Sequence, residues 1–247
     1  MPKLTLNTTR NYSPNFNVKK RNSKNIKFLI FHYTGMKNEK DAIERLTNIT
    51  SKVSCHYLIK NNGRIVNIVP DLYIAWHAGI SKWKNLNYLN RNSIGIEVSN
   101  PGHEFNYKKF SDKQIYSILK LSKFLIKKYK INRKNILGHS DVAPERKKDP
   151  GEKFPWKYLS KKKIGYWHNL DERNLIKKRR VKIFHSDKNK FIRNLFKIGY
   201  RRNNNLDFAK YSKLLTKAFQ RRFRPELING IIDKECLIIS KKLLKIN

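Results

Sequence analysis

Four polar side chains of this sequence lie in apolar surroundings, where a polar residue needs a reason. His32 ends the apolar run FLIFH, and Glu97 lies within the apolar run IGIEV. His139 and Asp149 both belong to the segment GHSDVAPERKKDPG. Two imidazoles and one carboxylate can bind zinc and leave its fourth position to water. A further carboxylate can then accept a proton from that water and pass it to a leaving group.

A lysine lies close in sequence to one of these residues, and together with all of them it would suit the hydrolysis of an amide. Lys147 precedes Asp149 by two positions and could stabilise the oxyanion of a tetrahedral intermediate. The spacing alone leaves a second interpretation open. His32 and His139 are far apart in the chain and no HExxH motif is present, so each histidine fits a hydrogen-bonded core residue at least as well.

The elements that must position these residues alternate between strands and helices. Short apolar runs at 27–35 and 93–102 predict buried strands, with His32 near the end of the first. The runs 54–59 and 63–70 flank the turn signal Asn-Gly and predict a strand hairpin. Strands interleaved with helical patterns are typical of an α/β domain.

A helix and one more strand precede the segment that carries His139. Ser111 and Gln114 have the spacing of a capping box, which predicts a helix beginning at that point. Its apolar positions follow the helical period, and they are Ile115, Ile118, Leu119, Leu125 and Tyr129. The run NILG at 135–138 then predicts a short strand that leads into the candidate site.

The last third of the chain has a different pattern. Residues 157–182 are rich in lysine and arginine and show little periodicity, which indicates a basic connecting segment. Helical patterns follow at 191–200, 206–223 and 233–246, with Asp233 as the expected cap of the last helix. These patterns predict a small all-α domain of three helices.

The charge of the chain is strongly positive, with 56 Lys and Arg residues against 18 Asp and Glu residues and a formal net charge of +38. Such a charge favours a polyanionic partner, whether nucleic acid, an anionic membrane surface or a cell-wall polymer. A compositional bias toward lysine explains the charge equally well. The basic residues are spread along the chain and no nucleic-acid motif is present, so we expect no nucleic-acid partner. No apolar run approaches the length of a membrane span.

Six segments of the sequence occur in an order that resembles a known enzyme family. The segments are FHYTG, SCHYLI, NNGRIVNIVP, AWHAG, NSIGIEVSNPG and GHSDVAPERKKDPG. Together they resemble the zinc-dependent N-acetylmuramoyl-L-alanine amidases of the type-2 family, and within it the AmpD/AmiD branch. The resemblance covers about residues 26–160. It implies a central mixed β-sheet flanked by helices, with one bound Zn²⁺.

The resemblance also implies a role for each matched residue. His32, His139 and Asp149 match the metal ligands of the family, which hold one zinc ion together with a water. Glu97 matches the catalytic glutamate, and Lys147 matches the lysine that assists at the carbonyl. The implied reaction is hydrolysis of the amide between N-acetylmuramic acid, or its 1,6-anhydro form, and L-alanine.

Four further residues are candidates for contact with the substrate, namely Trp76, His77, Asn92 and Arg146. For His77 a role in packing the loop is as plausible as a place in the cleft. Asn92 has the side chain of an ordinary loop residue. A cation such as Arg146 near the metal loop could hold a substrate carboxylate or could be solvated.

The C-terminal helices resemble a peptidoglycan-binding module. The expected organisation is an N-terminal arm (1–20), a zinc amidase catalytic domain (21–160), a basic linker (161–184) and a helical peptidoglycan-binding domain (185–247). The expected partners are peptidoglycan or anhydro-muropeptides, in cell-wall turnover or recycling. The alternative is a peptidoglycan-binding protein without catalytic activity.

Two features of the sequence point to different cellular compartments. The first twenty residues lack the apolar centre of a secretory signal, which predicts a cytoplasmic protein. The wall-binding resemblance of the tail favours the periplasm or cell envelope as the alternative. The sequence predicts no oligomeric state.

Overall fold

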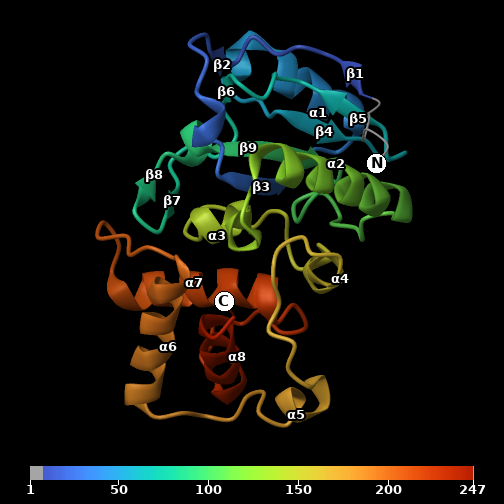
Figure 1. Ribbon diagram of the computed structural model, residues 1–247. Coiled ribbons are helices and arrows are strands. Elements are labelled where there is room, and N and C mark those ends of the chain that lie inside the picture. Colours follow the sequence, from blue (N-terminus) through green and yellow to red (C-terminus); the bar gives the residue numbers. More distant parts are fainter. Residues whose placement is uncertain (1–7, 247) are drawn as a thin grey trace.

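The computed structural model describes residues 8–246 of the chain, and residues 1–7 of the expected N-terminal arm lie outside that range. Figure 1 shows strands and their flanking helices at the top, with the helices of the C-terminal third below them. The longer strands are β3 (Phe28–Tyr33), β4 (Tyr57–Ile59), β5 (Ile65–Asn67), β9 (Ser93–Val98) and β10 (Ile136–Gly138). The two-residue strands are β1 (Thr9–Arg10), β2 (Phe16–Asn17), β6 (Ile74–Ala75), β7 (Lys82–Trp83) and β8 (Leu86–Asn87).

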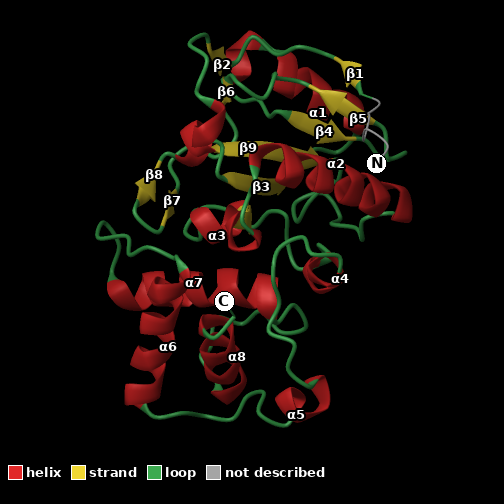
Figure 2. Ribbon diagram, viewed as in Figure 1, coloured by secondary structure: helices red, strands yellow, loops and turns green. Residues whose placement is uncertain are grey.

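Eight α-helices accompany these strands in the described part of the chain (Figure 2). They are α1 (Glu39–Thr47), α2 (Asp112–Tyr129), α3 (His139–Val142), α4 (Trp156–Lys161), α5 (Glu172–Ile176), α6 (His185–Ile198), α7 (Phe208–Phe223) and α8 (Lys234–Leu244). None of the described helices is both long and apolar enough to cross a membrane.

Six strands form one mixed sheet in the order β1-β5-β4-β9-β3-β10. The strands β4, β9, β3 and β10 run parallel to their neighbours, so their carboxyl ends meet at one edge of the sheet. Among the described strands of this sheet, only β4 and β5 pair antiparallel, as the predicted hairpin requires. A mixed sheet flanked by helices confirms the predicted α/β class. In such sheets the site forms where the parallel strands end.

The two faces of the sheet carry different helices because successive strand residues point to opposite sides. Tyr57 and Ile59 of β4 belong to the large apolar cluster that contains residues of α2, such as Leu121. Leu58 between them belongs to a smaller cluster with Leu46 of α1. The sheet is therefore covered on both faces, by α2 on one side and by α1 on the other.

The predicted capping box of α2 is present in the structure. The Ser111 side chain accepts from the backbone N–H of Gln114, and the Gln114 side chain accepts from the backbone N–H of Ser111. Its buried apolar residues include Ile118, Leu121 and Leu125, on one stripe of the helix. The described part of the arm, residues 8–20, adds β1 to the sheet edge and pairs β2 with β6.

The C-terminal third contains the three predicted helices, with α7 lying between α3 and the pair α6 and α8 (Figure 1). Asp233 caps α8 as expected, since its side chain accepts from the N–H of Cys236. Apolar residues of these helices, such as Leu215 and Phe219, belong to the same continuous cluster as the sheet residues Phe31 and Ile136. One hydrophobic core thus runs from the sheet into the C-terminal helices.

Candidate metal centre

Three polar side chains meet where β3 and β10 end. His32 is near the end of β3, and His139 is the residue directly after β10 and the first of α3. The parallel register pairs Phe31 with Gly138, so the two histidines that follow are neighbours. Asp149 reaches the same point from the loop after α3, and all three side chains are buried.

The potential ligand atoms of these residues converge. His32 Nδ1 lies 2.9 Å from His139 Nδ1, and each of these nitrogens lies 3.0 Å from Asp149 Oδ2. Together they form a group of three donors that could hold one metal ion. Whether a cation fits there depends on where the imidazole protons are, and the partners of the other ring nitrogens decide this.

The proton of His139 is assigned by a backbone carbonyl. His139 Nε2 lies 3.2 Å from the carbonyl oxygen of Ala78. A carbonyl only accepts hydrogen bonds, so this contact assigns the proton to Nε2. Arg146 Nη2 also lies 3.4 Å from Nε2, but it donates over a much shorter distance to the carbonyl oxygen of Ala78. The lone pair of a neutral His139 is therefore on Nδ1 and faces His32 and Asp149.

The proton of His32 is assigned by a chain of three hydrogen bonds. The Ser93 hydroxyl donates to the carbonyl oxygen of Leu89 at 2.6 Å, so it is left to accept from His77 Nε2 at 3.1 Å. His77 Nδ1 then accepts from His32 Nε2, also at 3.1 Å. This chain places the lone pair of His32 on Nδ1 as well. Hydrogen-bond partners of this kind fix the tautomer of histidines that bind metals.

Two lone pairs and a carboxylate therefore face one another with no proton assigned to lie among them. Burial raises the pKa of Asp149, but the adjacent His139 and His32 outweigh that effect and hold the pKa well below its ordinary value. Burial, with His139 next to it, lowers the pKa of His32 to about 4. A neutral His32, a lone pair on His139 and an ionised Asp149 are what a zinc site of two histidines and one aspartate requires.

Glu97 lies next to this centre without belonging to it. The register of β3 and β9 pairs Glu97 with His32, so both side chains project from the same face at the same edge. Its Oε2 is covered and has no hydrogen-bond partner among residues 8–246. Burial and the charge of Asp149 raise the pKa of Glu97 well above its ordinary value. A carboxyl with a raised pKa is suited to accept and return a proton during catalysis.

A cleft of about 360 Å³ opens above the centre. Its lining includes Glu97, Lys147, Trp76 and His77, beside the three potential ligands. The Trp76 ring is oriented by a hydrogen bond, because its Nε1 donates to Asn17 Oδ1 at 2.8 Å. The cleft thus presents an acid, a cation and an aromatic ring within one small volume.

Arg146 lines the same cleft and has identifiable backbone partners. Its Nε donates to the carbonyl oxygen of Ile80 at 3.0 Å, and its Nη2 donates to the carbonyls of both Ile80 and Ala78. Ala78 is also the partner of His139. Arg146 therefore ties the loop that carries Ala78 to the loop that carries the potential ligands.

Asn92 is the one candidate that the structure leaves away from the cleft. Its side chain donates to the carbonyl oxygen of Asn25 at 3.2 Å and is absent from the described lining. Ser93, the next residue, belongs to the hydrogen-bond chain behind His32, and sequence reasoning missed it. A buried serine at the start of a predicted strand carries no signal of its own, because its link to His32 runs through His77, which comes from another segment.

The chain is similar to several known amidases. The family described as N-acetylmuramoyl-L-alanine amidase (Amidase_2) matches residues 22–152. The N-acetylmuramoyl-L-alanine amidase AmiD of Escherichia coli is 36% identical over 233 residues, which cover 89% of this chain and 83% of AmiD. The 1,6-anhydro-N-acetylmuramyl-L-alanine amidase AmpD of Haemophilus influenzae is 41% identical over 111 residues, which cover 44% of this chain and 58% of AmpD.

Solved structures extend the similarity to the C-terminal helices. AmpDh3 of Pseudomonas aeruginosa superposes with a TM-score of 0.78 at 31% identity, over 99% of this chain and 98% of its own. E. coli AmiD, in complex with anhydro-N-acetylmuramic acid-L-Ala-D-gamma-Glu-L-Lys, gives a TM-score of 0.77 at 35% identity, over 90% and 89% of the two chains. Each covers far more of this chain than the family match at 22–152 does.

Proposed function

This chain belongs to the N-acetylmuramoyl-L-alanine amidase family, and we propose that it hydrolyses the amide between N-acetylmuramic acid, or its 1,6-anhydro form, and L-alanine. The substrate is peptidoglycan or a muropeptide released from it. AmiD was solved with an anhydro-muropeptide and AmpDh3 with an anhydromuramic pentapeptide, which supports this substrate class.

In this proposal His32, His139 and Asp149 hold one zinc ion, through Nδ1 of each histidine and the carboxylate. When bound there, zinc supplies a water of lowered pKa and polarises the carbonyl oxygen of the amide. The chain itself supplies the hydrogen bonds that keep both imidazoles oriented, from Ala78 and from His77. We assign His77 this positioning role, because both of its ring nitrogens are engaged within the protein.

Glu97 and Lys147 act on the substrate. Glu97 takes a proton from the attacking water and delivers it to the leaving amine of L-alanine, a use that matches its raised pKa and its unpartnered oxygen. Lys147, which lines the same cleft, stabilises the oxyanion that develops on the carbonyl. Trp76 offers an aromatic surface to the sugar or peptide. Arg146 has a positioning role, because it joins the loop of Ala78 and Ile80 to the loop that carries Asp149.

The observation that carries this function is the convergence of His32, His139 and Asp149 on one point, with their lone pairs facing one another. The test is to incubate the purified protein with anhydro-N-acetylmuramyl tripeptide and to follow the free tripeptide by mass spectrometry. We expect release of the peptide by the zinc-loaded protein and loss of release after treatment with a chelator. Added zinc should restore it.

Two outcomes would reject the proposal. One is a zinc-loaded protein that releases no peptide from soluble or intact substrate, which would favour the alternative of a binding protein without activity. The other is a chelator-treated, zinc-free protein that retains full activity. His139→Ala serves as the matched variant, because it removes one ligand and should abolish stoichiometric zinc binding together with peptide release.

For the whole chain we propose a catalytic domain at 21–160, a basic linker at 161–184 and a helical peptidoglycan-binding domain at 185–247. Its ability to bind the wall is tested by sedimentation with purified sacculi. Purified sacculi also test in which cellular compartment the protein works. Efficient release of peptides from intact sacculi favours the periplasm or envelope, and strict preference for soluble anhydro-muropeptides favours recycling in the cytoplasm.

A further inference from the structure

A fully buried carboxylate lies two residues after the metal-binding His139. Asp141 is 1% exposed and lies in α3. Its Oδ2 accepts from the backbone N–H of Gly138 at 2.8 Å, which closes the first turn of this short helix. Its other hydrogen bonds are made to side chains that do not belong to the sheet.

Both other partners of Asp141 come from the C-terminal helices. The Arg222 guanidinium of α7 forms an ion pair with Asp141 Oδ2, and its Nη2 donates to the carbonyl oxygen of Ile136 in β10 at 2.8 Å. The hydroxyl of Tyr200, which follows α6, donates to Asp141 Oδ1 at 2.7 Å. Arg222 and Tyr200 are themselves buried. A buried, hydrogen-bonded ion pair thus joins α7 to the segment that ends β10 and begins α3.

That segment holds two of the three proposed metal ligands. His139 is the first residue of α3, and the backbone N–H of Ser140 donates to the carbonyl oxygen of Asp149 at 2.8 Å. A shift of α3 would therefore move His139 directly and Asp149 through this bond. His32, on β3 between β9 and β10, has no such bond to α3 and would not follow. The relative positions of the three ligands depend on where α3 is held.

Aromatic packing makes this contact rigid. The Tyr200 ring packs edge-on against Trp83 at a centroid distance of 4.9 Å, and Trp83 is fully buried. Gly199 has a φ of +143° and faces Trp83 so closely that a Cβ atom would lie 2.4 Å from its ring. The Arg222 guanidinium stacks on Trp156 at 4.4 Å. These contacts leave the guanidinium and the phenol little freedom to follow a displaced carboxylate.

We propose that Arg222 and Tyr200 are positioning residues for the metal centre, which they hold in its binding geometry through Asp141. The C-terminal helices then contribute to zinc affinity, in addition to any contact that they make with the wall. This inference rests on the proposed function, because it presupposes the zinc site. Hydrogen-bond partners outside a metal's own ligands typically change its affinity by 10- to 100-fold.

The experiment compares three full-length variants. Tyr200→Phe removes one hydroxyl and keeps the ring against Trp83, and Arg222→Met removes the ion pair. We expect the zinc dissociation constant, measured by competition with a chelating dye, to rise about tenfold for Arg222→Met and by a smaller factor for Tyr200→Phe. Hydrogen exchange at the amides of Gly138 and Ser140, measured without zinc, should become faster in both variants.

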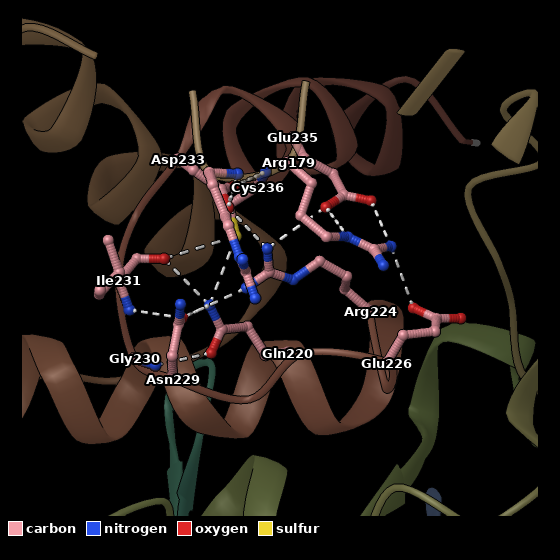
Figure 3. A network of polar contacts seen from close by, with 11 residues as sticks. Arg179, Gln220, Arg224, Glu226, Asn229, Gly230, Ile231, Asp233, Glu235 and Cys236 are labelled. Atoms are coloured by element: carbon pink, nitrogen blue, oxygen red, sulfur yellow. Dashed lines mark hydrogen bonds and ion pairs between the residues drawn. The ribbon is translucent and has the colours of Figure 1, made fainter. Parts of the chain in front are cut away.

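The third variant is a control at the residue that caps the C-terminal end of α7. Arg224 lies two residues after Arg222 and is equally buried, but its guanidinium pairs with Asp233 and Glu235 inside the C-terminal helices (Figure 3). Arg224→Met removes the same charge and makes the same change of side chain. We expect it to lower the melting temperature and to leave the zinc dissociation constant within twofold of the wild type.

Two results would overturn the inference. One is unchanged zinc affinity and unchanged exchange at Gly138 and Ser140 in both Tyr200→Phe and Arg222→Met. The other is an equal loss of zinc affinity in Arg224→Met, which would reflect general destabilisation. Failure of the proposed function looks different, because the wild type would then bind no zinc, while amide exchange would still report the contact with α3.

Discussion

Two buried polar clusters of this protein differ in how their charges are satisfied. At the edge of the sheet, His32, His139 and Asp149 point toward one another, and Oε2 of Glu97 is buried with no partner among the described residues. In the C-terminal helices, Glu235 receives two hydrogen bonds from Arg179, at 2.7 and 2.9 Å, and lies 3.3 Å from Nη1 of Arg224 (Figure 3).

This difference distinguishes a candidate catalytic site from a cluster that stabilises the fold. In the C-terminal cluster, each carboxylate is matched by a guanidinium or an N–H group, and the one cluster atom that is buried without a partner among the described residues is Nε of Arg224, a nitrogen donor. At the sheet edge, acceptors converge without a donor, a costly arrangement that persists when a cation or a reacting molecule completes it. Substitutions in the C-terminal cluster should therefore affect stability, and substitutions at the sheet edge should affect activity. The following predictions test this division, beginning with the largest effect.

Glu97→Gln should reduce activity more than any other change of comparable size. The amide keeps the shape of the side chain and cannot carry a proton between water and amine, so we expect kcat to fall about 10³- to 10⁴-fold. Stoichiometric zinc binding and the melting temperature should stay close to those of the wild type. A variant that keeps a tenth or more of the activity would remove Glu97 from the proposed mechanism.

Glu235→Gln should have the opposite profile. Removing one charge leaves Arg179 and Arg224 short of a partner in a buried setting, so we expect the free energy of unfolding to fall by about 3 kcal/mol. Zinc affinity should not change. Glu226→Gln is the matched control, because the exposed Glu226 also contacts Arg179, at 3.3 Å, and its loss should cost less than about 1 kcal/mol. Equal destabilisation by both variants would contradict the importance of burial.

The same two clusters show how far the sequence could be interpreted. The strands, the capping box at Ser111 and the helices of the C-terminal third could be predicted because their signals are local, within one turn or one strand. His32 and His139 are 107 residues apart, and only the parallel pairing of β3 and β10 brings them together. A single sequence contains no spacing rule for such pairs, so resemblance to a family had to supply the ligand set.

The contact between Arg222 and Asp141 had no sequence signal at all. The two residues are 81 positions apart, and in the sequence Asp141 has the appearance of an ordinary helix-capping residue. Arg222 follows another arginine near the end of a helix, where a solvated cation is expected. Burial of both, which depends on how α7 packs on α3, is what turns them into a pair.

Acid should weaken the C-terminal side of the molecule through His168. This residue is 2% exposed, and burial lowers its pKa to about 4. Unfolded histidine titrates near 6.5, so between these two values the unfolded state binds a proton that the folded state does not. Stability should therefore fall as the pH drops from 6.5 toward 4, by about 1–2 kcal/mol at pH 5 for this residue.

His168→Asn isolates that contribution. An asparagine can accept the hydrogen bond that Leu170 N–H makes to His168 Nδ1, and it does not titrate. We expect urea unfolding of the variant to depend less steeply on pH between 7 and 5 than that of the wild type. Identical slopes for the two proteins would show that His168 is not protonated on unfolding in this range.

The smallest change in stability is expected at an exposed ion pair. It joins a carboxylate to a cation as the buried pairs do, but water surrounds it. Lys157 and Glu172 form a close pair whose side chains are 46% and 52% exposed. Water and salt screen such a pair, and ordering two long side chains offsets most of the attraction, so Lys157→Ala should change the free energy of unfolding by less than about 0.5 kcal/mol. A loss of 2 kcal/mol or more would mean that pairing itself, rather than burial, determines the strength of the C-terminal cluster. The contrast with Glu235 would then fail, although both pairs join a carboxylate to a long cationic side chain.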